Sequence, residues 1–269
     1  MGKWIRRIIM LAVLAVFLFS VTSIVMILRQ YEESDRLYSQ IAEQYTTYTS
    51  RDGSQGAGTQ DAGAAAGQEA PEAAPISVDF QGLQAVNGDV CGWIYCGGTP
   101  IDYPVVRGED DTFYLKHNYD GSYNAAGSIF VEADNRPGFA DSNTIVYGHH
   151  MKNGSMFASL DLWAEQSFYE EHPVMWLLTP EQDYKIVLFS GYTTSATSDT
   201  YTIFEGPSQE LDAYLAKCRE QSDFSTEVEL DSEGRYVLLS TCAYVFDNAR
   251  YVLHGMLVPV DSAGGVPLR

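Results

Sequence analysis

Residues 236–242 read Tyr-Val-Leu-Leu-Ser-Thr-Cys, and Arg250 follows eight residues after the cysteine. The first four residues of this run are apolar and rich in strand formers, and a Glu-Gly turn precedes them. The run therefore predicts a strand that ends in a thiol, Cys242. Residues 243–249 predict a loop, and a second strand is expected to start at Tyr251. If the two strands pair side by side, Cys242 and Arg250 meet at their adjoining ends.

A thiol beside a fixed cation is the environment of a nucleophilic cysteine, because the thiolate is the reactive form and positive charge stabilises it. The other interpretation of the stretch is a buried cysteine followed by a solvated arginine. A proton-transfer partner lies upstream, where residues 143–150 predict a strand that ends in Gly-His-His. Adjacent strand residues point to opposite faces, so only one of His149 and His150 can face the thiol.

Several motifs in the same order give the chain a resemblance to the sortases, and to their class B branch in particular. The run from Thr144 to His149, the run from Leu239 to Cys242, and Arg250 are similar to the motifs of that family. Supporting matches are Gly92-Trp93-Ile94, Ile101-Asp102-Tyr103-Pro104-Val105-Val106 and Phe113-Tyr114-Leu115. Sortases are membrane-anchored cysteine transpeptidases of Gram-positive bacteria, and the resemblance extends over about residues 78–260.

The resemblance implies that His149, Cys242 and Arg250 carry the catalysis. His149 is preferred to His150 because it follows a glycine directly, as in the family motif. Arg250 would bind the oxyanion or the substrate carbonyl, and the backbone N–H of Ala243 is a second expected oxyanion donor. The substrate-binding positions that the resemblance implies are Ser240, Leu115, Thr197 and Tyr201.

The activity implied by the resemblance is cleavage of a C-terminal sorting signal of the Asn/Ser-Pro-x-Thr-x type through a Cys242 thioester. The protein would then pass to an amine of peptidoglycan or of its lipid precursor. Polymerisation of pilin subunits is the alternative within the family. Residues 50–75 lack the apolar or aromatic plug of a lid over the active site, which favours anchoring to the cell wall.

Two interpretations from other classes are a secreted cysteine hydrolase and a binding module without catalysis. In papain-type and cell-wall hydrolases the cysteine usually precedes the histidine in the chain, whereas here His149 precedes Cys242. The complete set of His, Cys and Arg argues against a binding module. Product analysis and labelling of Cys242 separate these interpretations from a transpeptidase.

Charge divides the chain into two unequal parts. The net charge is −20, and four of the 16 basic residues lie at or before Arg29. The remaining residues, 30–269, hold 12 basic and all 36 acidic side chains, which leaves them a net charge of −24. A nucleic-acid partner is therefore not expected, since phosphate binding needs a basic surface.

Neither a metal nor a cofactor is expected. The chain contains no Cys-x-x-Cys, and its carboxylates show no regular spacing of a calcium-binding type. Three cysteines other than Cys242 are interpreted as small buried hydrophobic residues: Cys91, Cys96 and Cys218.

Ile8 to Leu28 is a run of 21 residues without a charge, which at ~1.5 Å per residue spans about 31 Å. Basic residues precede it, so we expect a single-pass signal anchor at the cell membrane, with the N-terminus cytoplasmic and the remainder extracellular. The expected organisation is a cytoplasmic stub and transmembrane segment (1–29), a juxtamembrane helix (30–49), a flexible linker (50–75) and an extracellular catalytic domain (76–269).

The catalytic domain is predicted to be mainly β, with eight short strands separated by turns. This pattern favours a closed or nearly closed barrel, and it matches the sortase-type β-barrel that the resemblance implies. Short peripheral helices are expected around it, and Ser208–Gln221 predicts one helix inserted before the cysteine strand. Pro104 is expected to place its strand at an edge or at a bulge. Gly191–Asp199 is predicted to be a loop, and it is where the sequence departs most from the family.

Overall fold

The structure, a computed structural model, describes residues 2–48, 73–243 and 245–260. The chain divides into two compact units, Met1–Gln40 and Ile41–Arg269. Most of the predicted linker 50–75 lies outside the described residues.

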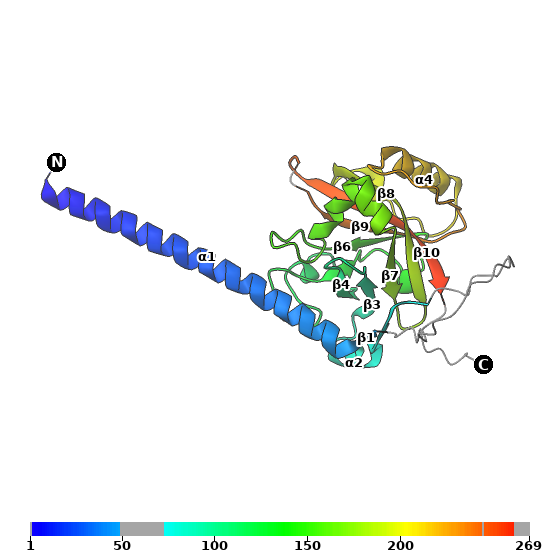
Figure 1. The fold of residues 1–269 in the computed structure, drawn as a ribbon, viewed down its shortest axis with the longest axis horizontal. Coiled ribbons are helices and arrows are strands. Elements are labelled where there is room, and N and C mark those ends of the chain that lie inside the picture. Colours follow the sequence, from blue (N-terminus) through cyan, green and yellow to red (C-terminus); the bar gives the residue numbers. More distant parts are fainter. Residues whose placement is uncertain (1, 49–72, 244, 261–269) are drawn as a thin grey trace, which may run out of the picture. The chain divides into compact units, whose positions relative to one another are not determined.

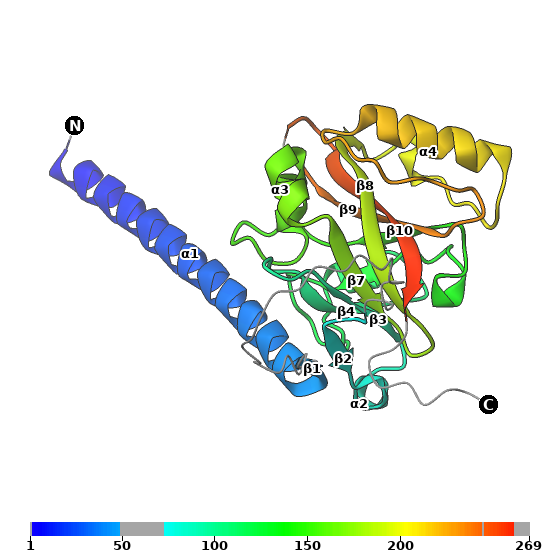
Figure 2. The same ribbon diagram turned by 45° about the vertical axis from the view of Figure 1, so that its right-hand side comes forward.

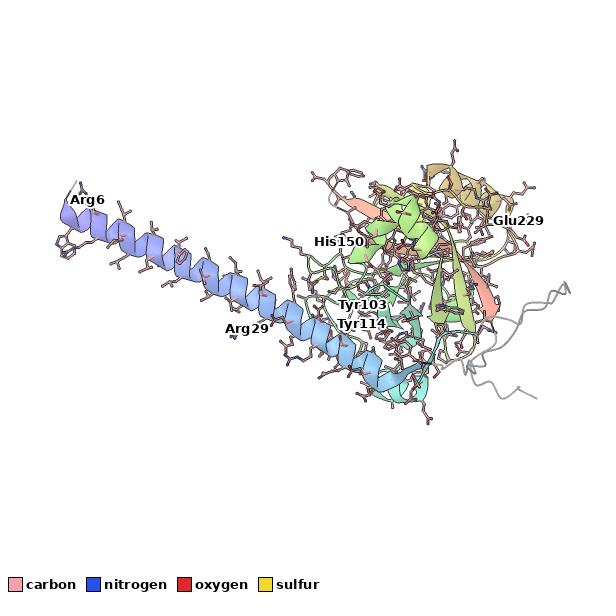
Figure 3. The ribbon with its side chains drawn as sticks, in the orientation of Figure 1. Arg6, Arg29, Tyr103, Tyr114, His150 and Glu229 are labelled. Atoms are coloured by element: carbon pink, nitrogen blue, oxygen red, sulfur yellow. The ribbon has the colours of Figure 1, made fainter. Side chains whose placement is uncertain are left out.

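Helix α1 (Lys3–Tyr45) is continuous over 43 residues. Arg6 lies near the start of this helix, and Arg29 directly follows its uncharged stretch (Figure 3). By length and composition this helix is a candidate membrane span. It ends at Tyr45, a few residues earlier than the juxtamembrane helix expected over 30–49.

Residues Thr46–Tyr48 form strand β1 instead of helix, and they pair antiparallel with β2 (Ile76–Val78). Two threonines and a tyrosine favour extended backbone, because β-branched and aromatic side chains fit a pleated surface. The backbone N–H of Asp79 also donates to the carbonyl of Tyr45 at 2.8 Å, which closes this small sheet.

Eight strands close into a barrel in the order β10-β8-β7-β3-β4-β5-β6-β9 (Figures 1 and 2). Their bounds are β3 (Val90–Tyr95), β4 (Asp102–Val106), β5 (Ile129–Val131), β6 (Asn143–Tyr147), β7 (Val174–Leu178), β8 (Asp183–Ser195), β9 (Tyr236–Cys242) and β10 (Ala249–Val260). The predicted eight-stranded barrel is confirmed. Around it lie the short helices α2 (Phe80–Val86), η1 (Phe113–Leu115), η2 (Pro137–Phe139), η3 (Ala158–Ala164), α3 (Gln166–Glu171), η4 (Asp199–Tyr201) and α4 (Gln209–Gln221).

Two strand predictions need correction. Strand β8 continues to Ser195, so half of the predicted loop 191–199 is strand, because β10 pairs with it along its whole length up to Ala249↔Ser195. The edge alternative for the Pro104 strand is wrong, since β4 pairs with both β3 and β5. The pairing of β4 with β3 does contain an irregularity, between Val90 and Gly92 of β3. Pro104 nevertheless precedes the two residues that pair with β5, so its missing N–H falls where that ladder has not begun.

Two buried tyrosines of the domain, Tyr103 and Tyr114, have partners for their hydroxyl groups. Tyr103 and Tyr114 lie in the interior, whereas Glu229 is exposed at the edge of the domain (Figure 3). The Tyr103 hydroxyl accepts the N–H of Met156 at 3.0 Å, and the Tyr114 hydroxyl donates to Asp89 at 2.7 Å. These bonds offset the cost of removing the hydroxyls from water.

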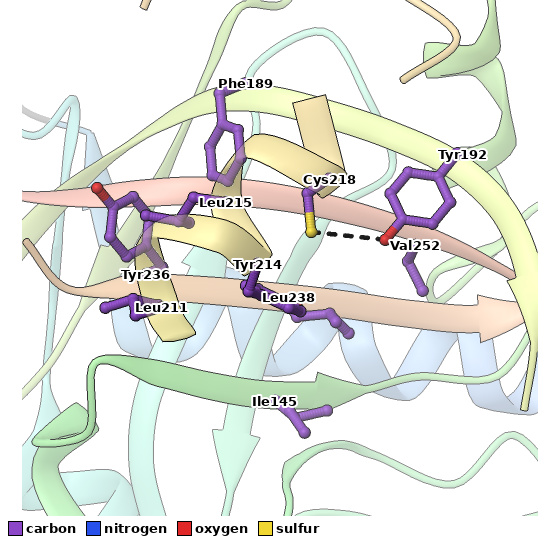
Figure 4. Packing of buried hydrophobic residues seen from close by; sticks show 10 residues of the cluster. All are labelled: Ile145, Phe189, Tyr192, Leu211, Tyr214, Leu215, Cys218, Tyr236, Leu238 and Val252. Carbon is purple, nitrogen blue, oxygen red and sulfur yellow. Dashed lines mark hydrogen bonds between the residues drawn. The ribbon is translucent and has the colours of Figure 1, made fainter. Parts of the chain in front are cut away.

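Helix α4 is the predicted insertion, and Ser208 caps it by accepting the N–H of Leu211 at 3.1 Å. Its buried face packs against the barrel strands (Figure 4). The cluster consists of Ile145, Phe189, Tyr192, Leu211, Tyr214, Leu215, Cys218, Tyr236, Leu238 and Val252. Helix α4 therefore covers the part of the barrel surface where Leu238 of β9 lies.

Candidate active site

Strand β9 carries its side chains alternately to two faces, so Leu238, Ser240 and Cys242 share one face. The α4 cluster covers Leu238, which is fully buried. Further along the same face, Ser240 and Cys242 line an open pocket of about 210 Å³. The end of β9 is thus left uncovered where the thiol stands.

Arg250 is the antiparallel partner of Cys242 in the β9–β10 pairing, as the sequence predicts. Directly opposite residues in such a pair point to the same face, with Cβ atoms about 4.5–5.5 Å apart. The Arg250 side chain therefore starts on the same face as the thiol, and both residues line the pocket. Arg250 Nη1 also donates to the carbonyl of Ala249 at 3.0 Å.

Strand β6 brings the histidine from the other side. It pairs parallel with β9 in the register Ile145↔Leu238 and Tyr147↔Ser240. The N–H of Gly148 then donates to the carbonyl of Ser240 at 3.1 Å. Continued by two residues, this register sets His149 level with Cys242, on the face that Ile145 and Tyr147 share. Three neighbouring strands thus supply histidine, cysteine and arginine at one level.

The His149 ring is held by a residue that lies 34 positions earlier in the chain. Its Nε2 is 2.7 Å from the carbonyl oxygen of Leu115, which follows from the position of η1 against the end of β6. A carbonyl only accepts hydrogen bonds, so Nε2 carries the hydrogen and Nδ1 is the nitrogen that can exchange a proton. His150 is turned away and pairs with Asp161 at 3.2 Å.

The pocket gathers residues from six segments of the chain. Its lining consists of Asp111, Leu115, Phe130, Glu132, Tyr147, Gly148, His149, Ser240, Thr241, Cys242 and Arg250. The predicted residues His149, Cys242, Arg250, Ser240 and Leu115 therefore come together in one place. No group of three or more His, Cys, Asp or Glu in the described ranges is arranged to hold a metal ion.

The other predicted positions differ among themselves. Tyr201 contacts the site through its hydroxyl, which lies 2.8 Å from Ser240 Oγ, and its ring stacks on Tyr147 at 6.2 Å between centroids. Thr197 is exposed in the turn after β8, bonds to Ser195 and is not part of the pocket lining.

Ala243 does not offer the backbone donor that the resemblance implies. Its N–H donates to the carbonyl of Ala249 at 2.9 Å, within the β9–β10 hairpin. Because an N–H has one hydrogen to give, this group would have to leave the hairpin before it could bind an oxyanion. Asp247, in the same loop, is exposed.

The sequence reasoning missed an acidic wall of the pocket. Glu132 follows β5 directly, and its Oε2 accepts the hydroxyl of Tyr147 at 2.6 Å. Burial, followed by a hydrogen bond with the Asp111 carboxyl, raises the pKa of Glu132 to about 7. Strand alternation could have indicated Tyr147, which lies two residues before His149, but no local pattern pointed to the two carboxyls.

The chain is similar in sequence and fold to known proteins. A family model for the sortase domain matches residues 97–258. Sortase B of Listeria monocytogenes is 37% identical over 184 residues, which cover 67% of this chain and 74% of the relative. The solved Staphylococcus aureus sortase B–substrate complex has a TM-score of 0.64 and 30% identity, and covers 68% of this chain and 85% of that one.

A solved sortase B from Bacillus anthracis has a TM-score of 0.69 and 28% identity, over 86% of this chain and 99% of that one. The barrel, the pocket around a cysteine and these relatives lead to one assignment. The chain belongs to the sortase family of cysteine transpeptidases, in its class B branch.

Proposed function

We propose that this sortase cleaves a C-terminal sorting signal of the Asn/Ser-Pro-x-Thr-x type and joins the released protein to an amine of peptidoglycan or of its lipid precursor. The observation that carries the proposal is that His149, which follows β6, and Cys242 and Arg250, which pair across β9 and β10, line one pocket. Such a set supplies a nucleophile, a proton carrier and a cation for the oxyanion.

In this proposal the Cys242 thiolate attacks the carbonyl carbon of the signal threonine and forms a tetrahedral intermediate. Arg250 stands on the same face as the thiol, so its guanidinium can donate to the oxyanion. His149 gives a proton to the leaving amine, and the C–N bond breaks to leave a thioester. The incoming amine then attacks that thioester and loses a proton to His149, and the C–S bond breaks, which regenerates the Cys242 thiolate and the protonated His149.

The hydrogen bond from His149 Nε2 to the Leu115 carbonyl supports this role for the ring. It holds the imidazole at the level of Cys242 and leaves Nδ1 for the proton transfers. Leu115 also lines the pocket, and Ser240 lies two residues before the thiol on the same face. Both are proposed to contact the signal peptide, and Tyr201 acts with Ser240 through its hydroxyl.

The relatives suggest both substrates. One solved Staphylococcus aureus structure is a sortase B–substrate complex, and another sortase B structure is complexed with triglycine. By analogy with these two structures, we infer that this enzyme uses a peptide as the acyl donor and an amine as the acceptor. Residues 8–28 of α1 would hold the enzyme in the cell membrane as a single-pass anchor, with its N-terminus cytoplasmic and its catalytic domain extracellular.

The test uses the full-length protein in detergent micelles, with fluorescent peptides of the Asn/Ser-Pro-x-Thr-x type and triglycine as the acceptor. We expect cleavage after threonine, diversion to a ligated product by the amine, and loss of both in Cys242→Ala and His149→Ala. Cleavage that survives Cys242→Ala would refute the mechanism. Hydrolysis that triglycine never diverts would indicate a hydrolase instead.

A further inference from the structure

The pocket that holds Cys242 has one acidic wall, formed by Asp111 and Glu132. The two residues come from different segments: Asp111 precedes η1, and Glu132 follows β5. This wall is part of the pocket itself, so a substrate that occupies the pocket lies against both carboxyls. Its chemistry therefore bears on which substrates the enzyme accepts.

Both carboxyls are fixed in place by hydrogen bonds. Asp111 Oδ1 accepts the N–H of Ala133 at 2.8 Å, and Glu132 Oε2 accepts the Tyr147 hydroxyl at 2.6 Å. Burial and the neighbouring Asp111 carboxyl raise the pKa of Glu132 to about 7. Neither side chain can swing into solvent without breaking these contacts.

No cation of the protein neutralises this wall among the described residues that line the pocket, where the only basic side chain besides His149 is Arg250. Arg250 faces Cys242 from β10. Arg107, which lies near the wall, uses its guanidinium to donate to the carbonyls of Ala133 and Asn135. The negative charge of Asp134 adds to that of the pair.

Two carboxyls that line one pocket, with no basic side chain in the described part of the chain paired to them, are well suited to receive a cation with several N–H donors. An ammonium group placed against them can donate to both carboxylates, and a proton held by Glu132 would leave for solvent as the cation binds. A neutral amide or alkyl group offers no such compensation. The wall therefore discriminates by charge.

We propose that Asp111 and Glu132 determine specificity for an ammonium group of the substrate, carried by a lysine side chain at the variable position of the sorting signal or by the acceptor amine. This inference rests on the proposed function for the identity of the substrate. The charge preference of the pocket itself can be measured without any sorting signal.

The first experiment labels Cys242 in the full-length protein with 2-aminoethyl methanethiosulfonate, a primary ammonium, and with neutral methyl methanethiosulfonate. The rate is read by mass spectrometry on the peptide that contains Cys242. We expect the ratio of the two rates, cation over neutral, to fall about tenfold in Glu132→Gln and in Asp111→Asn. An unchanged ratio in both variants would overturn the proposal, whatever the peptide assays show.

Two variants keep this readout specific. Glu229→Gln removes an exposed carboxylate at the edge of the domain and should leave the ratio unchanged (Figure 3). Tyr147→Phe removes the hydrogen bond to Glu132 but keeps both carboxyls. If Tyr147→Phe lowers the rate ratio as much as Glu132→Gln does, the two carboxyls affect labelling through the shape of the pocket and not through their charge. The proposal of charge discrimination then fails.

The second experiment identifies the source of the ammonium group with peptides whose variable residue is lysine or N-acetyl-lysine. If lysine is the ligand, wild type prefers it about tenfold in kcat/KM, and Glu132→Gln loses that preference. If the acceptor is the ligand, peptide preference is unchanged and the ratio of ligated to hydrolysed product falls in the variant. Absence of both effects in an active enzyme would overturn the proposal, whereas absence of cleavage by wild type contradicts the proposed function instead.

Discussion

Replacement of Gly148 by alanine is expected to disturb the site through packing alone. A Cβ atom at this position would lie 2.5 Å from Cδ1 of Ile129 and 2.6 Å from Cδ2 of Phe157. Ordinary contacts between carbon atoms are about 3.5–4.0 Å, so something must move by about 1 Å. Because Ile129 and Phe157 are fully buried and have no free space to move into, we expect the backbone at the end of β6 to be displaced instead.

The magnitude follows from that displacement. Overpacking of a closed core costs about 1–3 kcal/mol, which for a domain of this size lowers Tm by roughly 2–12 °C. His149 is the next residue, and its carbonyl accepts the N–H of Phe157 at 3.0 Å, so it shifts with the glycine. A misplacement of about 1 Å can cost on the order of 100-fold in rate, and we expect kcat/KM to fall by about that factor.

The assay pairs thermal unfolding, followed by circular dichroism, with peptide cleavage at a temperature where the variant is fully folded. Gly88→Ala serves as the control, because a Cβ there meets nothing within 4 Å and its effect should stay within about 0.5 kcal/mol. Wild-type Tm in Gly148→Ala would refute the packing argument. A lowered Tm with unchanged kcat/KM would refute the claim that this glycine positions His149.

Three further predictions concern other parts of the domain. Arg250→Ala should lower kcat by about 10²–10³ with little change in Tm. Arg250→Lys should restore only part of the lost kcat, because lysine lacks the planar guanidinium with its paired N–H donors. Equal kcat in wild type and Arg250→Ala would exclude the oxyanion role. Leu238→Ala should lower the free energy of unfolding by about 2–5 kcal/mol in urea titrations, because Leu238 is fully buried under α4. A decrease below about 1 kcal/mol would contradict that packing. Burial lowers the pKa of His254 to about 3, from the 6.5 of an exposed ring. As pH drops from 6.5 to 3, the unfolded chain therefore binds a proton at His254 before the folded chain does. The free energy of unfolding falls over this range by up to about 4 kcal/mol. His254→Gln should lose that part of the pH dependence in urea unfolding at pH 4.5 and 7, and an identical slope in both proteins would show that another group is responsible.

Much of the fold could be predicted from local patterns in the chain. The helix predicted over Ser208–Gln221 is present as α4 (Gln209–Gln221). Helix α4 buries Leu211, Tyr214, Leu215 and Cys218, the residues that share one face at helical spacing. Such patterns are reliable because a helix or strand must bury its own apolar face, and the residues of that face recur at a fixed period.

Strand ends were harder to predict, because the neighbouring strand decides them. Residues 191–195 look like a loop by composition, yet they extend β8 because β10 offers them a partner up to Ala249. Thr46–Tyr48 likewise become a strand only because Ile76–Val78 lies alongside. A backbone hydrogen-bond partner that is distant in sequence leaves no trace in local composition.

The sequence by itself determined which residues could do chemistry: a thiol at a strand end, a histidine after a glycine, an arginine eight residues after the thiol, and an uncharged stretch long enough for a bilayer. Only the tertiary structure decided their placement. The registers of β6 and β10 on β9 bring His149 and Arg250 level with Cys242, and they also commit the N–H of Ala243 to the hairpin. Asp111 and Glu132 meet only when η1 and β5 pack together. The physical reason is that side-chain type and local period are properties of neighbouring residues, whereas register and pocket walls depend on contacts between segments far apart in the chain.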